Sequence, residues 1–370
     1  MPQRRRIARV LLVLLSVLMV SLSITLISSQ VRGLSFLSHA AKSAPLSAGT
    51  VTEYPIPTPI SEPVGIASGP DGNLWFTEGH GNNIGKITTS GQITEYALPH
   101  AESEPEGITS GPDGNLWFTE FSSVYGNRIG KITTSGTITE YPLPNSDSEP
   151  ESIATGPDGN LWFTEFDGDR IGTITPSGTI TEYTLPNADS EPEGITNGPC
   201  GDSTQADCLW FTEYGLVNTQ TDSANIGRIT TNGVITEYPL STRYARANDI
   251  TLGPNGTLYF TQQANNGSDT GASVQATIGQ VTTAGQVQMS ALPPLPNGGC
   301  IPNSITEGSD GNLWFTEYYQ IGSMTPGGAL IEYPLPTGSS SFLPDNIAAG
   351  SDGNLWFTEF TGGNIGRITI

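Results

Sequence analysis

One short motif, Leu-Trp-Phe-Thr-Glu, recurs along the chain and constrains its fold more than any other feature. It starts at Leu74 and returns, with small changes, at intervals of 42–55 residues up to Leu355. The fifth copy has Tyr259 in place of tryptophan and Gln262 in place of glutamate. A repeat of this length is typical of β-propeller blades, and seven copies predict seven blades.

Each repeat indicates four short strands. In the second repeat, a strand at 107–109 precedes a Gly-Pro-Asp-Gly turn and a strand at 116–120; further strands follow at 129–133 and 137–143. Glycine in the turns accepts the positive φ that tight hairpins require. Leu-Trp-Phe-Thr is apolar on both faces, as expected between two blades, whereas Thr-Ile-Thr-Glu-Tyr alternates like an outer strand.

The two ends of the repeat array complement each other. The chain finishes on a third strand at 365–369, and residues 51–56 form an isolated fourth strand near its start. The N-terminal strand can complete the last blade and remove the exposed sheet edges. We therefore predict an all-β, seven-bladed β-propeller of four-stranded blades over residues 50–370, with the ring closed by the N-terminal strand.

The segment before the repeats has the composition of an export signal. Arginines at 4–6 and 9 precede an apolar run at 10–27, and small residues follow near 38–44. We interpret residues 1–44 as a signal peptide or membrane anchor and 45–49 as a linker. The apolar run approaches the ~20 residues that span a bilayer, so both alternatives stay open. The protein is expected to be secreted or extracellular, and membrane-anchored only if this segment is not cleaved.

The chain is strongly acidic, with 36 Asp and Glu against 14 Lys and Arg and a formal net charge of −22. Such a surface repels nucleic acid and favours cations or cationic ligands, although solubility alone also accounts for it. We expect a small-molecule or peptide ligand on the axial face. No sequence feature indicates an oligomer, so a monomer is expected.

Three cysteines are present. Cys200 and Cys208 flank an insertion where other repeats have a tight turn, and in an oxidising compartment they are expected to form a disulfide. Cys300 is left as a thiol.

Several phrases resemble the virginiamycin B lyase (streptogramin B lyase) family: Glu-Pro-Glu-Gly-Ile-Thr from Glu104, Asn-Leu-Trp-Phe-Thr-Glu from Asn115, and Arg-Ile-Gly-Lys-Ile-Thr from Arg128. The resemblance covers roughly residues 50–370. It implies a lyase that opens the lactone of a cyclic depsipeptide by C–O elimination. A base removes the proton α to a carbonyl, and Mg²⁺ stabilises the enolate.

The resemblance also implies where the family's reacting groups lie. Its last blade reads Glu-Pro-His-Gly-Ile, and its penultimate blade supplies a second histidine. Here those positions hold Leu343, Asp345 and Asn303, while Glu359 matches a second family glutamate. Since neither histidine has a counterpart, we expect linearisation of streptogramin B to be absent or very slow, with Asp345 as a weak candidate base.

Carboxylates gather instead in the first four repeats. We predict an acidic arc on one face near the axis that binds Mg²⁺ or Ca²⁺ through oxygen ligands. The alternative is a solvated loop copied with the repeat. The arc comprises Glu62, Glu78, Glu104, Glu106, Glu120, Glu149, Glu151, Glu165, Glu191, Glu193 and Glu213; Glu359 is a further candidate ligand at the family position.

His80 and His100 lie in loops expected on the same face, so either is a weak candidate for a relocated catalytic base. Two other functions compete with the lyase. One is a non-catalytic extracellular propeller that binds a ligand or cation, and the other is a lactonase-type metal hydrolase with carboxylates around Ca²⁺.

Overall fold

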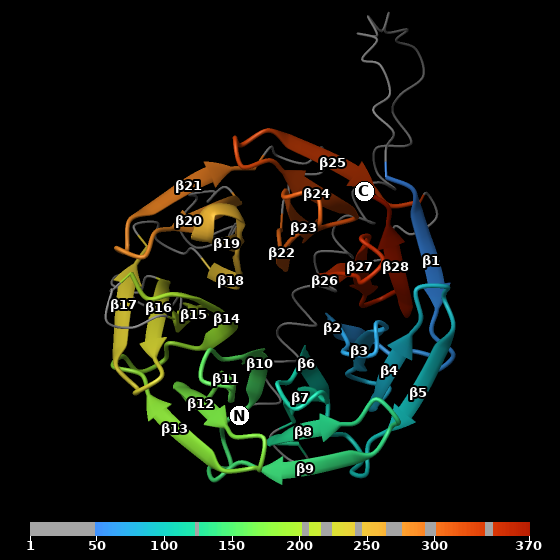
Figure 1. The fold of residues 1–370 in the computed structure, drawn as a ribbon, viewed down its shortest axis with the longest axis horizontal. Coiled ribbons are helices and arrows are strands. Elements are labelled where there is room, and N and C mark those ends of the chain that lie inside the picture. The colour runs from blue at the N-terminus through green and yellow to red at the C-terminus, as the bar shows by residue number, and fades with distance from the viewer. Residues whose placement is uncertain are drawn as a thin grey trace, which may run out of the picture. The chain divides into compact units, whose positions relative to one another are not determined.

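The structure, a computed structural model, describes residues 49–122, 126–201, 207–215, 224–240, 246–263, 276–292, 301–336 and 343–370. The export segment and Cys300 lie outside these ranges. The unit Gly49–Ile370 contains seven antiparallel four-stranded sheets arranged in a ring (Figure 1). The predicted all-β, seven-bladed propeller is confirmed. In the described ranges, no helix is long and apolar enough to cross a membrane.

The blades are numbered from the N-terminus and their strands run from the axis outward. Blade 1 contains β2 (Pro63–Ser68), β3 (Leu74–Glu78), β4 (Asn83–Ile87) and β5 (Ile93–Ala97). Blade 2 contains β6 (Pro105–Ser110), β7 (Leu116–Glu120), β8 (Arg128–Ile132) and β9 (Ile138–Pro142). Blade 3 contains β10 (Pro150–Thr155), β11 (Leu161–Glu165), β12 (Arg170–Ile174) and β13 (Ile180–Thr184). Blade 4 contains β14 (Pro192–Pro199), β15 (Asp207–Glu213), β16 (Asn225–Thr230) and β17 (Ile235–Pro239).

Blade 5 contains β18 (Arg246–Leu252), the short 3₁₀ helix η1 (Pro254–Gly256), β19 (Leu258–Gln263), β20 (Thr277–Val281) and β21 (Val287–Ala291). Blade 6 contains β22 (Ile305–Glu307), β23 (Leu313–Glu317), β24 (Gln320–Met324) and β25 (Leu330–Pro334). Blade 7 contains β26 (Pro344–Ala349), β27 (Leu355–Glu359), β28 (Asn364–Ile368) and, from the other end of the chain, β1 (Val51–Pro55).

The second strand of each blade packs against both neighbouring blades. In β3, Trp75 joins the core formed with Leu116 and Phe118 of blade 2, whereas Leu74 and Phe76 join the core with Trp356 of blade 7. Side chains alternate between the faces of a strand, so a strand enclosed on both faces must be apolar at every core position. The Trp-Phe motif is therefore the packing unit of the ring.

One hydrogen-bond arrangement, which we call the latch, repeats on the second strand of every blade. In blade 1, the hydroxyl of Thr77 donates to the backbone oxygen of Glu106 in blade 2 (2.6 Å) and accepts from the backbone N–H of Gly65 in its own blade (2.8 Å). Thr119, Thr164, Thr212, Thr261, Thr316 and Thr358 make equivalent contacts. A buried hydroxyl thus ties each inner strand to the next.

The N-terminal strand closes the ring as predicted. β1 pairs antiparallel with β28 in the register Val51↔Ile368 to Pro55↔Asn364. Tyr54 stacks on Trp356 with the ring centroids 5.6 Å apart.

The insertion in blade 4 is closed by a disulfide. Cys200 and Cys208 are joined, with their Cα atoms 5.1 Å apart.

Candidate functional site

Seven residues, one from each blade and each at or just before its innermost strand, accept the threonine hydrogen bonds through their backbone oxygens. We call them the axial ring: Val64, Glu106, Glu151, Glu193, Asn248, Asn303 and Asp345. The latch fixes their backbones in equivalent positions, while their side chains differ. Blades 2–4 provide glutamates, and blades 5–7 provide two amides and an aspartate. The blades therefore share a scaffold here but not a chemistry.

Asn303 connects three blades through its side chain. Its Oδ1 accepts from Asn248 Nδ2 (2.8 Å), and its own Nδ2 donates to the carboxylate of Asp345 and to the Asp345 backbone oxygen (3.2 Å). Asn248 is 4% exposed, whereas Asn303 and Asp345 are half-buried. The orientation of the Asn303 amide is consistent, because its nitrogen donates and its oxygen accepts. The Oδ1 of Asn248 is buried without a hydrogen-bond donor in the described structure.

A half-buried aspartate next to the network links blades 5 and 6. Asp249 accepts hydrogen bonds from the Ser304 hydroxyl (2.7 Å) and the backbone N–H groups of Ile305 (2.9 Å) and Ile250 (2.8 Å). Burial raises the pKa of Asp249, and the three donated hydrogen bonds oppose that effect. Sequence reasoning missed Asn248, Asp249 and Ser304. The signal was Asn248-Asp249-Ile250, where blades 1, 2 and 4 have glycine before the isoleucine.

The predicted acidic arc divides into three sets. The first contains Glu62, Glu104, Glu149 and Glu191, whose backbones are left-handed with φ of 46–53°. Their backbone oxygens accept from the residue after the second strand, for example from Phe121 N–H to Glu104 at 3.0 Å. These glutamates therefore clamp two loops together. The second set contains the half-buried axial-ring residues Glu106, Glu151 and Glu193.

The third set lies inside the blades. Glu78, Glu120, Glu165 and Glu213 are at most 1% exposed. Burial raises the pKa of Glu78 and Glu213 to about 8 and that of Glu120 to about 7; burial also raises the pKa of Glu165. A glutamate on the fourth strand of the same blade contributes to each shift through its negative charge: Glu95, Glu237, Glu140 and Glu182.

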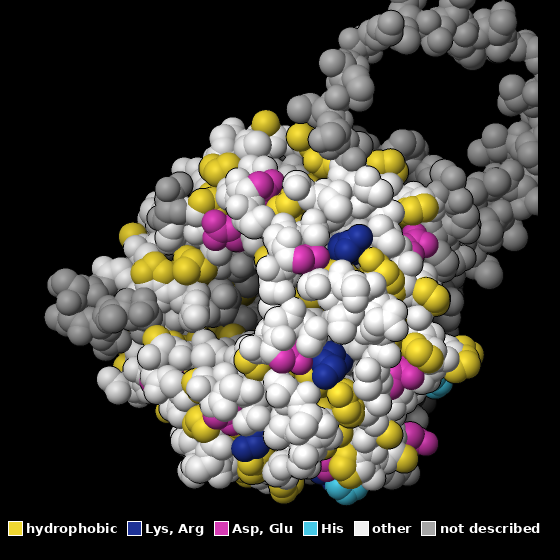
Figure 2. All heavy atoms as spheres, turned by 45° about the vertical axis from the view of Figure 1, so that its right-hand side comes forward, with side chains coloured by type: hydrophobic (Ala, Val, Ile, Leu, Met, Phe, Trp, Pro, Cys, Tyr) yellow, Lys and Arg dark blue, Asp and Glu magenta, His cyan; other side chains and the backbone are white. Residues whose placement is uncertain are grey.

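The acidic arc does not form one cluster in the described residues, and its binding of a metal ion stays a prediction. Among the residues that the structure describes, no three His, Cys, Asp or Glu side chains are grouped closely enough to hold a metal ion. The physical reason is strand alternation. Thr77 and Glu78 are neighbours, so when Thr77 reaches the next inner strand, Glu78 points to the opposite face of the sheet. Figure 2 shows acidic side chains in separate patches over the visible side of the ring.

The residues at the family's metal positions do not fit Mg²⁺ either. Leu343 offers no side-chain oxygen; its backbone oxygen accepts from Phe360 N–H (2.9 Å). Glu359 is fully buried and accepts from Asn364 Nδ2 (2.9 Å), and burial raises its pKa to about 7. Mg²⁺ is usually bound through ionised carboxylates and waters. Leu343 therefore cannot be a side-chain ligand, and the carboxylate of Glu359 is already engaged by Asn364 inside the blade.

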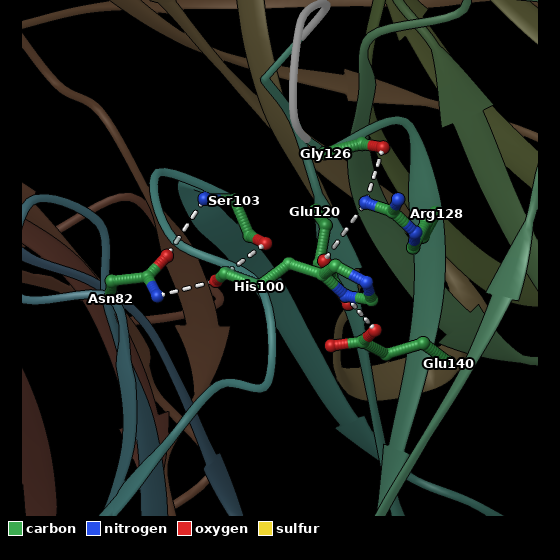
Figure 3. A network of polar contacts seen from close by, with 7 residues as sticks. All are labelled: Asn82, His100, Ser103, Glu120, Gly126, Arg128 and Glu140. Atoms are coloured by element: carbon green, nitrogen blue, oxygen red, sulfur yellow. Dashed lines mark hydrogen bonds and ion pairs between the residues drawn. The ribbon is translucent and has the colours of Figure 1, made fainter.

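Neither histidine joins the axial ring. His80 is exposed in the loop between β3 and β4. Figure 3 shows the imidazole of His100 directed at Glu140 of the outer strand β9, with Nδ1 and Oε2 2.5 Å apart. The same bond recurs in other blades as Asn145 to Glu182 and Asn187 to Glu237, both 2.5 Å. His100 thus occupies an architectural position that asparagine fills elsewhere.

We expect His100→Asn to change the melting temperature by less than about 2 °C, since exposed substitutions that keep their contacts usually cost under 0.5 kcal/mol. His100→Ala removes the bond to Glu140 and is expected to cost about 1 kcal/mol. Thermal melting of both variants at pH 7 tests this. Equal destabilisation by asparagine and alanine would contradict the architectural role.

Comparisons with known proteins agree with this fold. A model of the virginiamycin B lyase family matches residues 37–271 and 269–370. A solved streptogramin B lyase has a TM-score of 0.75 at 37% identity, covering 88% of this chain and 99% of that one. Virginiamycin B lyase from Staphylococcus aureus has a TM-score of 0.74 at 36% identity, covering 87% and 99%. A catalytically inactive histidine-to-alanine variant of that protein, solved with quinupristin, gives 0.74 at 37% identity over 87% and 99%.

Proposed function

This chain belongs to the virginiamycin B lyase family, and on that premise we propose that it is an exported ligand-binding propeller without efficient lyase chemistry. Its ligand is an amide-bearing small molecule or peptide, held over the axial ring of blades 5–7. Export rests on the signal-like composition of residues 1–44.

The observation that carries the proposal is the network around Asn303. The elimination expected of the family needs a base at an α-proton. The side-chain amide of Asn303 is not basic, and it is engaged on both sides by Asn248 and Asp345. An aspartate ordinarily titrates near 3.9, against about 6.5 for imidazole, so it is the weaker base at neutral pH. The Asp345 carboxylate is also engaged, because it accepts a hydrogen bond from Asn303.

The same groups suit recognition. Two amides and a carboxylate side by side present both donors and acceptors, which matches the peptide or lactam groups of a ligand. The glutamates of blades 2–4 share the axial ring, and the chain carries a net charge of −22. The resulting field favours a neutral or cationic ligand over an anionic one.

Incubation with quinupristin and Mg²⁺, followed by mass spectrometry, tests the catalytic half of the proposal. General-base catalysis typically contributes about 10²–10⁴-fold. We therefore expect ring opening at least ~100-fold slower than with the S. aureus enzyme. Turnover comparable to that enzyme would overturn the proposal.

Calorimetry with quinupristin tests the binding half. We expect a measurable heat with the wild-type chain and at least ~10-fold weaker binding by Asn303→Leu, which removes the central amide. Gln92→Leu, on an exposed outer turn of blade 1, is the matched polar-to-apolar control and should bind like wild type. If wild type shows no binding, or if Asn303→Leu binds equally well, the axial ring is not the site for this class of ligand.

A further inference from the structure

An aromatic stack repeats in the outer half of six of the seven blades. In six blades the indole of the second strand stacks with the phenol ring of the fourth, with centroids 5.2–5.7 Å apart. In five of these the tyrosine also fills the space above the third hairpin turn of the next blade. A Cβ built on the glycine of that turn would lie 2.1–2.3 Å from the ring. The pairs are Tyr54 with Gly91, Tyr96 with Gly136, Tyr141 with Gly178, Tyr183 with Gly233 and Tyr238 with Gly285.

Blade 5 lacks this ring. Ser290 pairs with Ile278 in the register in which Tyr96 pairs with Ile84, so serine stands at the tyrosine position. The next turn shows the consequence: no heavy atom of the described chain lies within 4 Å of a Cβ built on Gly328. A recess of about 200 Å³ remains between blades 5 and 6, which adjoin in Figure 1.

The recess has an apolar floor and a polar rim. Ile278, Met324 and Tyr259 line it and are 1%, 6% and 8% exposed. Gln280 and Ser290 provide hydrogen-bonding groups at the rim. In blades 1 and 2 the position of Gln280 holds Lys86 and Lys131, whose ammonium groups lie over the aromatic stack. None of the residues that line the recess in the described chain is charged, so it suits a neutral ring.

We propose that this recess is a binding site for the aromatic ring of a small, neutral phenolic molecule. The other six blades indicate the chemistry of the ligand, because each places the phenol ring of a tyrosine at the equivalent position. Apolar cavities of about 150 Å³ hold benzene, so the recess has room for one ring with a hydroxyl and a small alkyl group. The ring would stack on Tyr259, and its hydroxyl would reach Gln280 or Ser290. The recess is lined by β19, β20, β21, β24 and the turn at 325–328, and none of its lining residues belongs to the axial ring.

The probe is p-cresol, which is the tyrosine side chain itself. The chain has four methionines, and Met324 lines the recess. In full-length protein labelled with ¹³C at the methionine methyls, we expect p-cresol to shift the Met324 signal saturably, with a dissociation constant on the order of 1 mM for so small a ligand. 4-Methylcyclohexanol tests the need for an aromatic ring, and p-toluate tests the need for neutrality. Both are expected to bind at least ~10-fold more weakly.

Filling the recess should abolish binding. Ser290→Tyr restores the missing ring and is expected to weaken p-cresol binding at least ~10-fold, whereas Ser290→Ala should bind within about 2-fold of wild type. Ser290→Phe fills the same volume and serves if the tyrosine variant folds poorly. No saturable shift of Met324 in wild type, or unchanged affinity after the recess is filled, would overturn the assignment.

Discussion

Deletion of residues 49–57 is expected to lower the melting temperature of the propeller by roughly 10 °C or to prevent folding. β1 is the fourth strand of blade 7, and its removal exposes the whole edge of β28. It also removes Tyr54 from Trp356 and Ile56, which is 7% exposed, from the core shared with blade 1. Each buried side chain of this size contributes about 1.5–3 kcal/mol. The sum, about 5 kcal/mol, corresponds to roughly 10 °C for a domain of this size.

The comparison is a chain that begins at residue 49, melted under the same conditions. A synthetic peptide of residues 49–57 added to the deleted protein should restore part of the lost stability, because it can pair with β28. Identical melting of the two chains would show that β1 does not close the ring.

The architecture was predictable because local and non-local signals agreed. The Trp-Phe motif set the repeat, Gly-containing turns set the hairpins, and an unpaired strand at each end of the array required closure. Within a repeat protein, each residue is also observed several times in equivalent surroundings. This is what identified His100 as the counterpart of Asn145 and Asn187 once the structure gave their common partner position.

The candidate site was less predictable, because it depends on which face of a strand a side chain occupies. Glu78 ends β3 at the same end at which β2 begins, as expected. Its side chain, however, points to the face opposite Thr77 and into the blade. Glu95 lies on the outer strand β5, as the alternation predicts, and it contributes to the raised pKa of Glu78. The sequence held one signal of this pairing, because blade 5 replaces both glutamates together. Gln262 stands at the position of Glu78, and Met289 stands at the position of Glu95.

The paired glutamates predict an unusual pH dependence of stability. Their carboxyl oxygens include buried atoms with no hydrogen-bond donor in the described structure, such as Oε1 of Glu213 and of Glu237. Carboxylate oxygens only accept hydrogen bonds, so two facing carboxylates need a shared proton. Burial is the main cause of the pKa values of about 7 to 8 for Glu78, Glu120, Glu213 and Glu359, and the negative charge of a glutamate on the fourth strand of the same blade adds to it.

The sign follows from proton uptake. Below pH 4.5, the usual pKa of glutamate, these carboxyls are protonated in both folded and unfolded chains. Between pH 4.5 and about 8 the unfolded chain releases the protons while the folded chain keeps them, so raising the pH favours unfolding. Asp71, Asp113 and Asp352 have lowered pKa values, because hydrogen bonds from neighbouring asparagines and tryptophans outweigh the effect of burial. The stability that these aspartates contribute is lost only as the pH falls below 3.8. Maximal stability is therefore expected between about pH 3.8 and 4.5.

Glu213→Gln should remove one of the proton-dependent steps. Glutamine is a neutral residue of the same shape, and its N–H can donate to Glu237 without a shared proton. Blade 5 already has Gln262 at the equivalent position. A pKa near 8 instead of 4.5 corresponds to a penalty of up to about 5 kcal/mol above pH 8. We expect the variant to be more stable than wild type at pH 8–9 by a few kcal/mol and to lose less stability from pH 5 to 9. Urea unfolding across that range measures both quantities.

The matched control is Glu332→Gln, which changes an exposed glutamate on the fourth strand of blade 6 and should keep the wild-type slope. If Glu213→Gln and wild type show the same pH slope, Glu213 does not hold a proton in the folded state.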